Sequence, residues 1–218
     1  MNIYMLFQKG GVFMYPLLIC STIVLAIVLE RCYYFSKVKD CSDKTLEEVE
    51  QLVYQHRTLE AKEVCEDTNC PVSQVLSTGI KNYQKPREER DRILQRIGSK
   101  ELQKMGKNIR GLGIIAHVSP LIGLLGTVTG MIKAFMKIYE LGGSVDPSVL
   151  AGGISEALIT TAAGLTVAIP AMLFYQYFEG KLDGYYNNMK EAVQLLSEWL
   201  GEKQSELGET KEDMEYGF

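Results

Sequence analysis

Three long apolar stretches interrupt an otherwise charged chain. Gly10–Leu29, Gly111–Ile132 and Ala157–Phe178 contain no Asp, Glu, Lys or Arg, so all 27 acidic and 23 basic residues lie outside them. A helix needs about 20 apolar residues to cross the ~30 Å hydrocarbon core of a membrane. The pattern therefore predicts an all-α membrane protein with three transmembrane helices.

The first apolar stretch lies close to Met1, where a secretory signal would also lie. It is longer than the core of a signal peptide, and it ends at Glu30 and Arg31 instead of at a small-residue cleavage site. We interpret it as a permanent span.

The polar segments also read as helices. Thr45 followed by Glu48 is a capping-box pattern, and Pro71 and Pro86 each stand where a first helical turn would begin. From Pro86 the apolar spacing predicts one helix of about 50 residues that continues into the second span.

After the third span, apolar residues recur at steps of three and four, which predicts a long helical extension with a narrow apolar stripe. Beyond Gly201 the chain is acidic and contains glycine, and we expect a weakly ordered tail. The predicted segments are 1–9 (short terminus), 10–30 (first span), 31–110 (polar helices), 111–137 (second span), 138–150 (loop), 151–178 (third span), 179–200 (helical extension) and 201–218 (tail).

The distribution of Lys and Arg predicts the orientation. Basic residues are dense between Arg31 and Arg110, whereas 138–150 contains none. Basic residues resist translocation and stay on the cytoplasmic side. We therefore expect an extracytoplasmic amino terminus, an extracytoplasmic loop at 138–150, and a cytoplasmic carboxyl terminus, with the second and third helices extended far into the cytoplasm.

Composition narrows the function. The net charge of −4 argues against nucleic-acid binding, and no phosphate-binding loop, metalloprotease motif or nucleophile–histidine pair is present. We expect no enzyme activity, no cofactor and no metal; Cys65 and Cys70 lack zinc-site spacing and are expected to be free thiols on the reducing side. Any work that the protein performs would then draw on the ion gradient across the membrane, which releases about 2.3 kcal/mol for each charge that moves through 100 mV.

Polar residues inside the spans are the first candidates for function, because hydrocarbon offers them no water. Apart from Glu30, the last residue of the first span, Glu156 is the only carboxylate in a predicted spanning helix, and Thr160 shares its face through the i to i+4 relation. Glu156 could line an ion path or simply cap the helix at the interface. A hydrogen bond to a neighbouring helix is enough to explain His117, and we assign it no functional role.

Small residues form one face on each of the last two spans. Spacing of this kind lets helix backbones approach closely, so we interpret these residues as helix-packing positions. They are Gly123, Gly126, Gly130, Gly153, Ala157 and Gly164.

Three segments carry a resemblance to a known family. GGVFMYPLLICSTIVLAIVLER, PLIGLLGTVTGMIKAF and LAGGISEALITTAAGLTVAIPA resemble the three membrane segments of the MotA/TolQ/ExbB proton-channel family, and three spans match its TolQ/ExbB branch. The resemblance places Thr127 and Thr161 at pore-lining positions and Glu156 at the glutamate that begins the third span. Thr160 adds a hydroxyl, which leaves open whether the ion is H⁺ or Na⁺.

The resemblance also implies an assembly in the bacterial inner membrane. It implies a homopentameric ring that holds a single-span ExbD- or TolR-like partner in its pore, whose Asp carries the ion, and that works on a TonB- or TolA-like envelope protein. Besides work on a TonB-like or a TolA-like protein, a third use of such an ion-driven assembly is a specialised motor. The rival from another class is a structural membrane scaffold that forms a ring without conducting ions.

Overall fold

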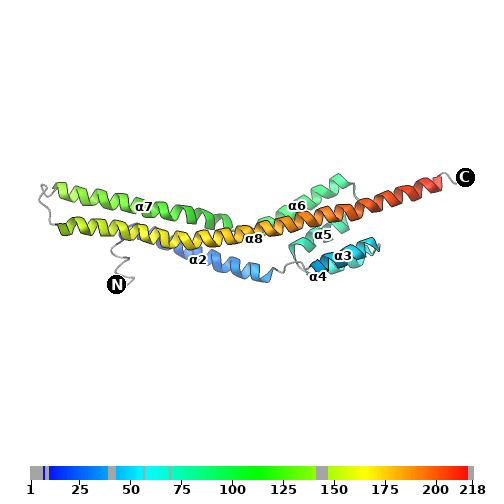
Figure 1. The fold of residues 1–218 in the computed structure, drawn as a ribbon, viewed down its shortest axis with the longest axis horizontal. Helices are drawn as coiled ribbons and strands as arrows, with labels where there is room; N and C mark the ends of the chain where they lie inside the picture. The colour runs from blue at the N-terminus through cyan, green and yellow to red at the C-terminus, as the bar shows by residue number, and fades with distance from the viewer. Residues whose placement is uncertain are drawn as a thin grey trace. The chain divides into compact units, whose positions relative to one another are not determined.

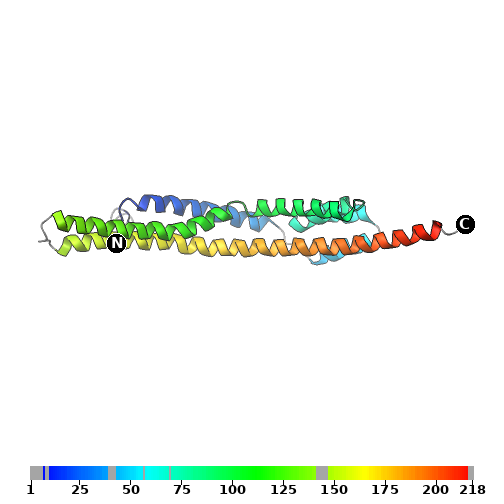
Figure 2. The same cartoon turned by 90° about the horizontal axis from the view of Figure 1, so that it is seen from above.

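The computed structural model describes residues 7, 10–38, 43–55, 57–68, 70–140 and 147–215. Within these ranges the chain is entirely helical apart from turns (Figures 1 and 2). The helices are α2 (Met14–Lys37), α3 (Asp43–Tyr54), α4 (Thr58–Thr68), α5 (Pro71–Lys81), α6 (Arg87–Met105), α7 (Ile109–Glu140) and α8 (Pro147–Glu215).

Three of these helices are long and apolar enough to cross a membrane: α2, α7 and the part of α8 from Leu150 to Trp199. The three spans expected from the sequence therefore coincide with three helices of sufficient length and apolar composition. Residues 1–6 of the short terminus and 141–146 of the loop lie outside the described residues.

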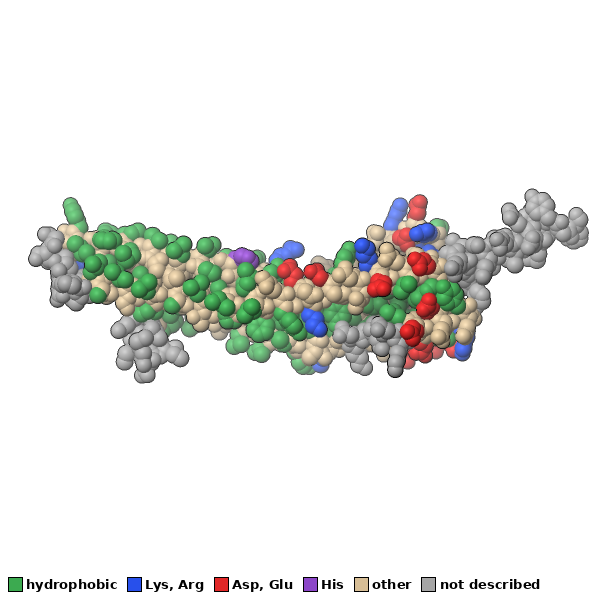
Figure 3. All heavy atoms as spheres, in the orientation of Figure 1, with side chains coloured by type: hydrophobic (Ala, Val, Ile, Leu, Met, Phe, Trp, Pro, Cys, Tyr) green, Lys and Arg blue, Asp and Glu red, His purple; other side chains and the backbone are tan. Residues whose placement is uncertain are grey.

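The chain divides into two compact units. We call Met1–Cys32 with Asn108–Glu179 the apolar unit, and Tyr33–Lys107 with Gly180–Phe218 the charged unit. On the face drawn in Figure 3, hydrophobic side chains cover the apolar unit and most Lys, Arg, Asp and Glu side chains belong to the charged unit.

Within the apolar unit, α7 and the first half of α8 lie side by side and antiparallel (Figures 1 and 2). The amino-terminal end of α2 follows a turn in which Gly11 has a φ of 67°, a conformation that glycine adopts without steric cost. At the other end of α2, Glu30 forms an ion pair with the buried Arg31 and accepts a hydrogen bond from Asn108 at 3.2 Å.

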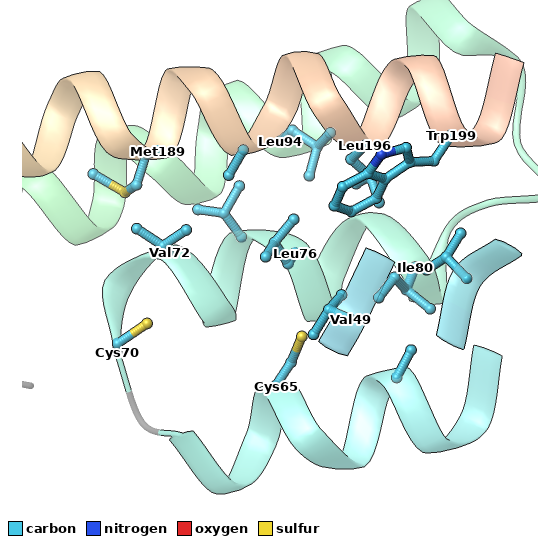
Figure 4. Packing of buried hydrophobic residues seen from close by; sticks show 14 of the residues in the cluster. Val49, Cys65, Cys70, Val72, Leu76, Ile80, Leu94, Met189, Leu196 and Trp199 are labelled. Atoms are coloured by element: carbon cyan, nitrogen blue, oxygen red, sulfur yellow. The ribbon is translucent and has the colours of Figure 1, made fainter. Parts of the chain in front are cut away.

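The charged unit has its own core. Helices α3 to α6 pack against the second half of α8 around a cluster that includes Val49, Leu76, Leu94 and Leu196 (Figure 4). Trp199 closes one end of the cluster, where its Nε1 donates a hydrogen bond to Glu50 at 3.1 Å. This cluster is the connected hydrophobic core of the charged unit.

Two expectations about helix length are wrong. The long helix expected from Pro86 ends at Met105, because the chain turns at Gly106 and Asn108, which adopts a left-handed φ of 65°. Asn tolerates this conformation better than other residues with a side chain. The tail expected to be weakly ordered is helical as far as Glu215.

The expectation of free thiols holds only in part. Cys65 is a free, buried thiol, whereas Cys70 is disulfide-bonded. The expectation rested on the compartment, and a sequence contains no information on how close two sulfur atoms lie. Cys41 lies outside the described residues.

Candidate functional site

The contact between α7 and α8 is built from small residues. A Cβ atom added to Gly164 would lie 2.7 Å from the backbone oxygen of Ser119, and one added to Gly123 would lie 3.1 Å from the Cα of Thr161. The two backbones are therefore in direct contact, which any larger side chain at either glycine would prevent.

The same contact continues along both helices. A Cβ at Gly130 would meet Ala157 at 3.1 Å, one at Gly153 would meet Ala134 at 2.7 Å, and one at Gly126 would overlap the side chain of Thr160. All six small residues singled out in the sequence thus lie at this helix pair.

The four oxygen-bearing candidates occupy one short length of it. Thr161 lies against Gly123, Thr160 lies against Gly126, and the residue after Glu156 lies against Gly130. Thr127 directly follows Gly126. These positions span the eight residues from Gly123 to Gly130 of α7, or about 10 Å. We call Thr127, Glu156, Thr160 and Thr161 the oxygen belt.

Each threonine of the belt donates its hydroxyl proton to a backbone carbonyl. Thr161 donates to Gly123 at 3.0 Å across the helix pair, and Thr127 donates to Leu124 at 2.6 Å within α7. Both side chains are half-buried. A hydroxyl that has donated its proton keeps its lone pairs, so both can accept a hydrogen bond or coordinate a cation.

Thr160 is placed differently. It is 1% exposed, and the carbonyls of Gly10 and Glu156, both 2.9 Å from its Oγ1, share its one hydroxyl proton. It therefore ties α8 to the turn before α2 within a single subunit.

The carboxylate of Glu156 lies against the same turn. The side chain is half-buried, and a Cβ atom on Gly11 would overlap its Oε1. Sequence reasoning missed Gly10 and Gly11; the available signal was a pair of adjacent glycines directly before an apolar run. The backbone of Gly11 therefore lies close against the carboxylate.

His117 lies apart from the belt. Its ring is exposed, and Nδ1 lies 2.7 Å from the carbonyl of Gly113 one turn earlier. Within the described residues no group of His, Cys, Asp and Glu is arranged to hold a metal ion.

Comparison with known proteins places this geometry in a family. A model of the MotA/TolQ/ExbB proton channel family matches residues 67–191, which is more than half of the chain. The chain belongs to this family. The matched range contains α7, the first half of α8 and therefore the whole oxygen belt of this MotA/TolQ/ExbB family member.

Relatives of this MotA/TolQ/ExbB chain carry ExbB names. An ExbB-like biopolymer transport protein of Synechocystis sp. is 35% identical over 174 residues, covering 78% of this chain and 68% of the relative. An ExbB homolog of Methanothermobacter thermautotrophicus is 30% identical over 195 residues, covering 89% and 68%. The biopolymer transport protein exbB1 of Vibrio cholerae is 27% identical over 197 residues, covering 88% and 86%.

Proposed function

We propose that this chain is the channel-forming subunit of an energy transducer driven by the proton-motive force. It resides in the bacterial inner membrane, with the amino terminus in the periplasm and the carboxyl terminus in the cytoplasm. The family match and the ExbB names of its relatives support this function. The concentration of Lys and Arg between Arg31 and Arg110 supports the orientation.

The oxygen belt is the observation on which the proposal rests. It places three hydroxyls and one carboxylate within about 10 Å along a helix pair in which apolar and small residues predominate. An ionised carboxylate in a membrane costs several kcal/mol unless it meets water or a partner. A path that admits water and ions offers that compensation.

In the proposed mechanism, five copies form a ring around a single-span ExbD- or TolR-like partner. Ions enter past Glu156 and pass Thr127 and Thr161, whose lone pairs face the acidic residue of the partner that carries the ion. Thr160 holds the turn before α2 against the helix pair and thereby fixes the position of the Glu156 backbone. Ion passage moves ring and partner relative to each other.

This relative motion acts on an envelope protein of the TonB or TolA kind and so drives import or envelope maintenance. H⁺ is the proposed ion. A sodium-driven specialised motor is the alternative within this class, since hydroxyl and carboxylate oxygens are ligands suited to a hard cation.

Conduction is tested by removing oxygen atoms from the belt without changing its shape. We expect Thr161→Val and Glu156→Gln, each co-reconstituted with the partner in liposomes, to lower partner-dependent ion flux at least tenfold, about 1.4 kcal/mol in the barrier. Flux is read from a pH-sensitive dye and, separately, from a sodium-sensitive dye. Native mass measurement establishes that each variant still assembles.

Thr166→Val is the matched control. Thr166 is an exposed residue of α8 whose hydroxyl donates only to Ala162 within its own helix, at 2.8 Å. Its loss should leave the flux unchanged. If Thr161→Val and Glu156→Gln assemble and retain full flux, the conduction mechanism is wrong.

A structural scaffold is the rival function. The six small residues of the α7–α8 contact favour it, because close helix packing alone accounts for them. A scaffold would retain partner-dependent work in every belt variant that assembles, whereas a channel would lose it.

A further inference from the structure

The charged unit carries a basic face on α6. Arg92, Arg96 and Lys100 are exposed, and at 100° per residue they lie within roughly a quarter turn of one another. Lys107 is also exposed and follows in the turn after α6 ends at Met105. Between 91 and 107 this face contains no acidic residue, because Glu101 points to the buried side and accepts from Lys104 at 2.6 Å.

These four basic residues have no ion-pair partner among the described residues. The ion pairs on and just before α6 use other bases: Lys85 with Glu89 at 2.6 Å, Arg87 with Asp91 at 3.9 Å, and Lys104 with Glu101. Three unpaired positive charges on one face of α6, with a fourth in the turn that follows, favour an acidic partner.

An acidic face lies on the charged-unit half of α8. Asp183, Glu191 and Glu198 are exposed and share one side of the helix with Asn187 and Gln194. Within the described residues none of the three acids has an ion-pair partner. Lys190 flanks this face and lines a separate groove between α6 and α8.

The acidic face borders a polar cavity of about 730 Å³. Asp91, Gln95, Gln194 and Glu198 are among its lining residues, together with Arg87. The Oδ1 atom of Asp91 is buried without a hydrogen-bond partner. The cavity therefore offers one acceptor, Asp91 Oδ1, that forms no hydrogen bond within the described residues, and Arg87 is among the residues that line it.

The basic face does not pair with the acidic face of the same chain. On α6 the residues that line the spaces shared with α8 include Asp91, Gln95 and Leu102, and the middle of the basic face lies about a third of a turn away from them. On α8 the core is contacted by Met189 and Leu196, and the acidic face is on the opposite side. The acidic face therefore borders the cavity beside α6, whereas the exposed basic face is directed away from that cavity.

The basic residues of α6 and the acidic residues of α8 nevertheless lie at matching positions along the length of the two helices. Leu94 and Leu196 meet at Gly79, and Gly106 lies beside Leu182, so α6 and α8 run antiparallel. Arg92 is therefore level with Glu198, and Lys107 is level with Asp183. Arg96 and Lys100 lie just either side of the level of Glu191.

A ring relates these faces. Rotation about an axis along α8 keeps every residue at its own level, and a heterologous contact joins two different faces of neighbouring copies. We propose that the basic face of α6 in one copy pairs with the acidic face of α8 in the next, with Arg92 and Arg96 beside the polar cavity. This inference rests on the proposed ring and names the contact that closes it outside the membrane.

Cross-linking tests the contact in the assembled complex. We mix ¹⁴N- and ¹⁵N-labelled chains, assemble them with the membrane partner, and treat the complex with a zero-length carbodiimide. The expected products join Lys100 to Glu191 and Lys107 to Asp183 in peptides of mixed isotope composition. Products in which Lys100 is joined only to another protein, or to no acidic residue of this chain, overturn the proposal.

Charge reversal provides the second measurement. We expect Arg92→Glu/Arg96→Glu, and separately Glu191→Arg/Glu198→Arg, to weaken association of neighbouring copies about tenfold in low salt. The four substitutions combined restore complementarity and should recover most of the loss. The control Lys62→Glu/Lys85→Glu changes the net charge equally, touches only local i,i+4 pairs, and should have no effect.

The outcomes separate this inference from the proposed function. If the combined variant assembles no better than either pair alone, the pairing is wrong. A ring that conducts ions normally without the cross-links refutes the pairing and leaves the channel intact. A wild-type chain that stays monomeric beside its partner refutes the ring and the pairing with it.

Discussion

Adding one methyl group at Gly164 should separate α7 from α8. The Cβ of Gly164→Ala would lie 2.7 Å from the backbone oxygen of Ser119, whereas ordinary contact begins near 3.4 Å. A backbone oxygen within a helix cannot turn aside, so the helices must move apart by about 0.7 Å at this point.

That movement has a calculable cost. It would stretch the hydrogen bond from Thr161 to Gly123 from 3.0 Å to about 3.7 Å, beyond hydrogen-bonding distance. Overpacking costs about 1–3 kcal/mol and the lost hydrogen bond about 1 kcal/mol, against a gain of about 1 kcal/mol from replacing glycine in a helix. The net expectation is destabilisation by about 1–3 kcal/mol.

Gly152→Ala is the matched control. It lies on the same helix in the same unit, and a Cβ there has no atom within 4 Å. It should be neutral or stabilising by up to about 1 kcal/mol. The measurement is unfolding of the detergent-solubilised protein by SDS, followed by circular dichroism. Equal effects at Gly164 and Gly152 would refute the close backbone contact.

Three further outcomes are expected. Gly11→Ala should reduce ion flux, because a left-handed alanine costs about 1–2 kcal/mol and its Cβ would displace the carboxylate of Glu156; unchanged flux would contradict the packing of that turn. In the native complex the exposed Cys32 should react with a maleimide, whereas Cys65 should not react even at pH 9. Burial, and secondarily the nearby Glu66, raise the pKa of the Cys65 thiol to about 12. Mass spectrometry distinguishes the two cysteines, and equal labelling would be inconsistent with a buried Cys65. Trp199 is the single tryptophan and is 3% exposed, so its emission should be blue-shifted and weakly quenched by acrylamide until the charged unit unfolds.

The spans and the helix-packing face can be predicted from the sequence because each has a physical cause that leaves a pattern along the chain. Exclusion of charge over about 20 residues follows from bilayer thickness, and spacing of small residues follows from helix geometry. Both are periodic or continuous signals along the chain. The contacts of Gly123 and Gly164 were therefore foreseeable as contacts between helices, although the distances were not.

Non-periodic features were not accessible in the same way. The end of α6 depends on a left-handed Asn108, and a single Gly before it was too weak a signal against continuous apolar spacing. The contact of Gly11 with Glu156 joins residues far apart in sequence. Thr160 and Thr161 are adjacent in sequence, yet one is tied to the turn before α2 and the other to α7.

The direction of the threonine hydrogen bonds has a consequence for what the proposed path rejects. Thr127, Thr160 and Thr161 each commit their single proton to a carbonyl. None has a donor left for chloride or hydroxide, and the negative Glu156 repels both. The proposed path would then exclude anions without a fixed positive charge and without a narrow filter. The backbone carbonyls, by accepting those three protons, leave the threonines no donor with which to bind an anion.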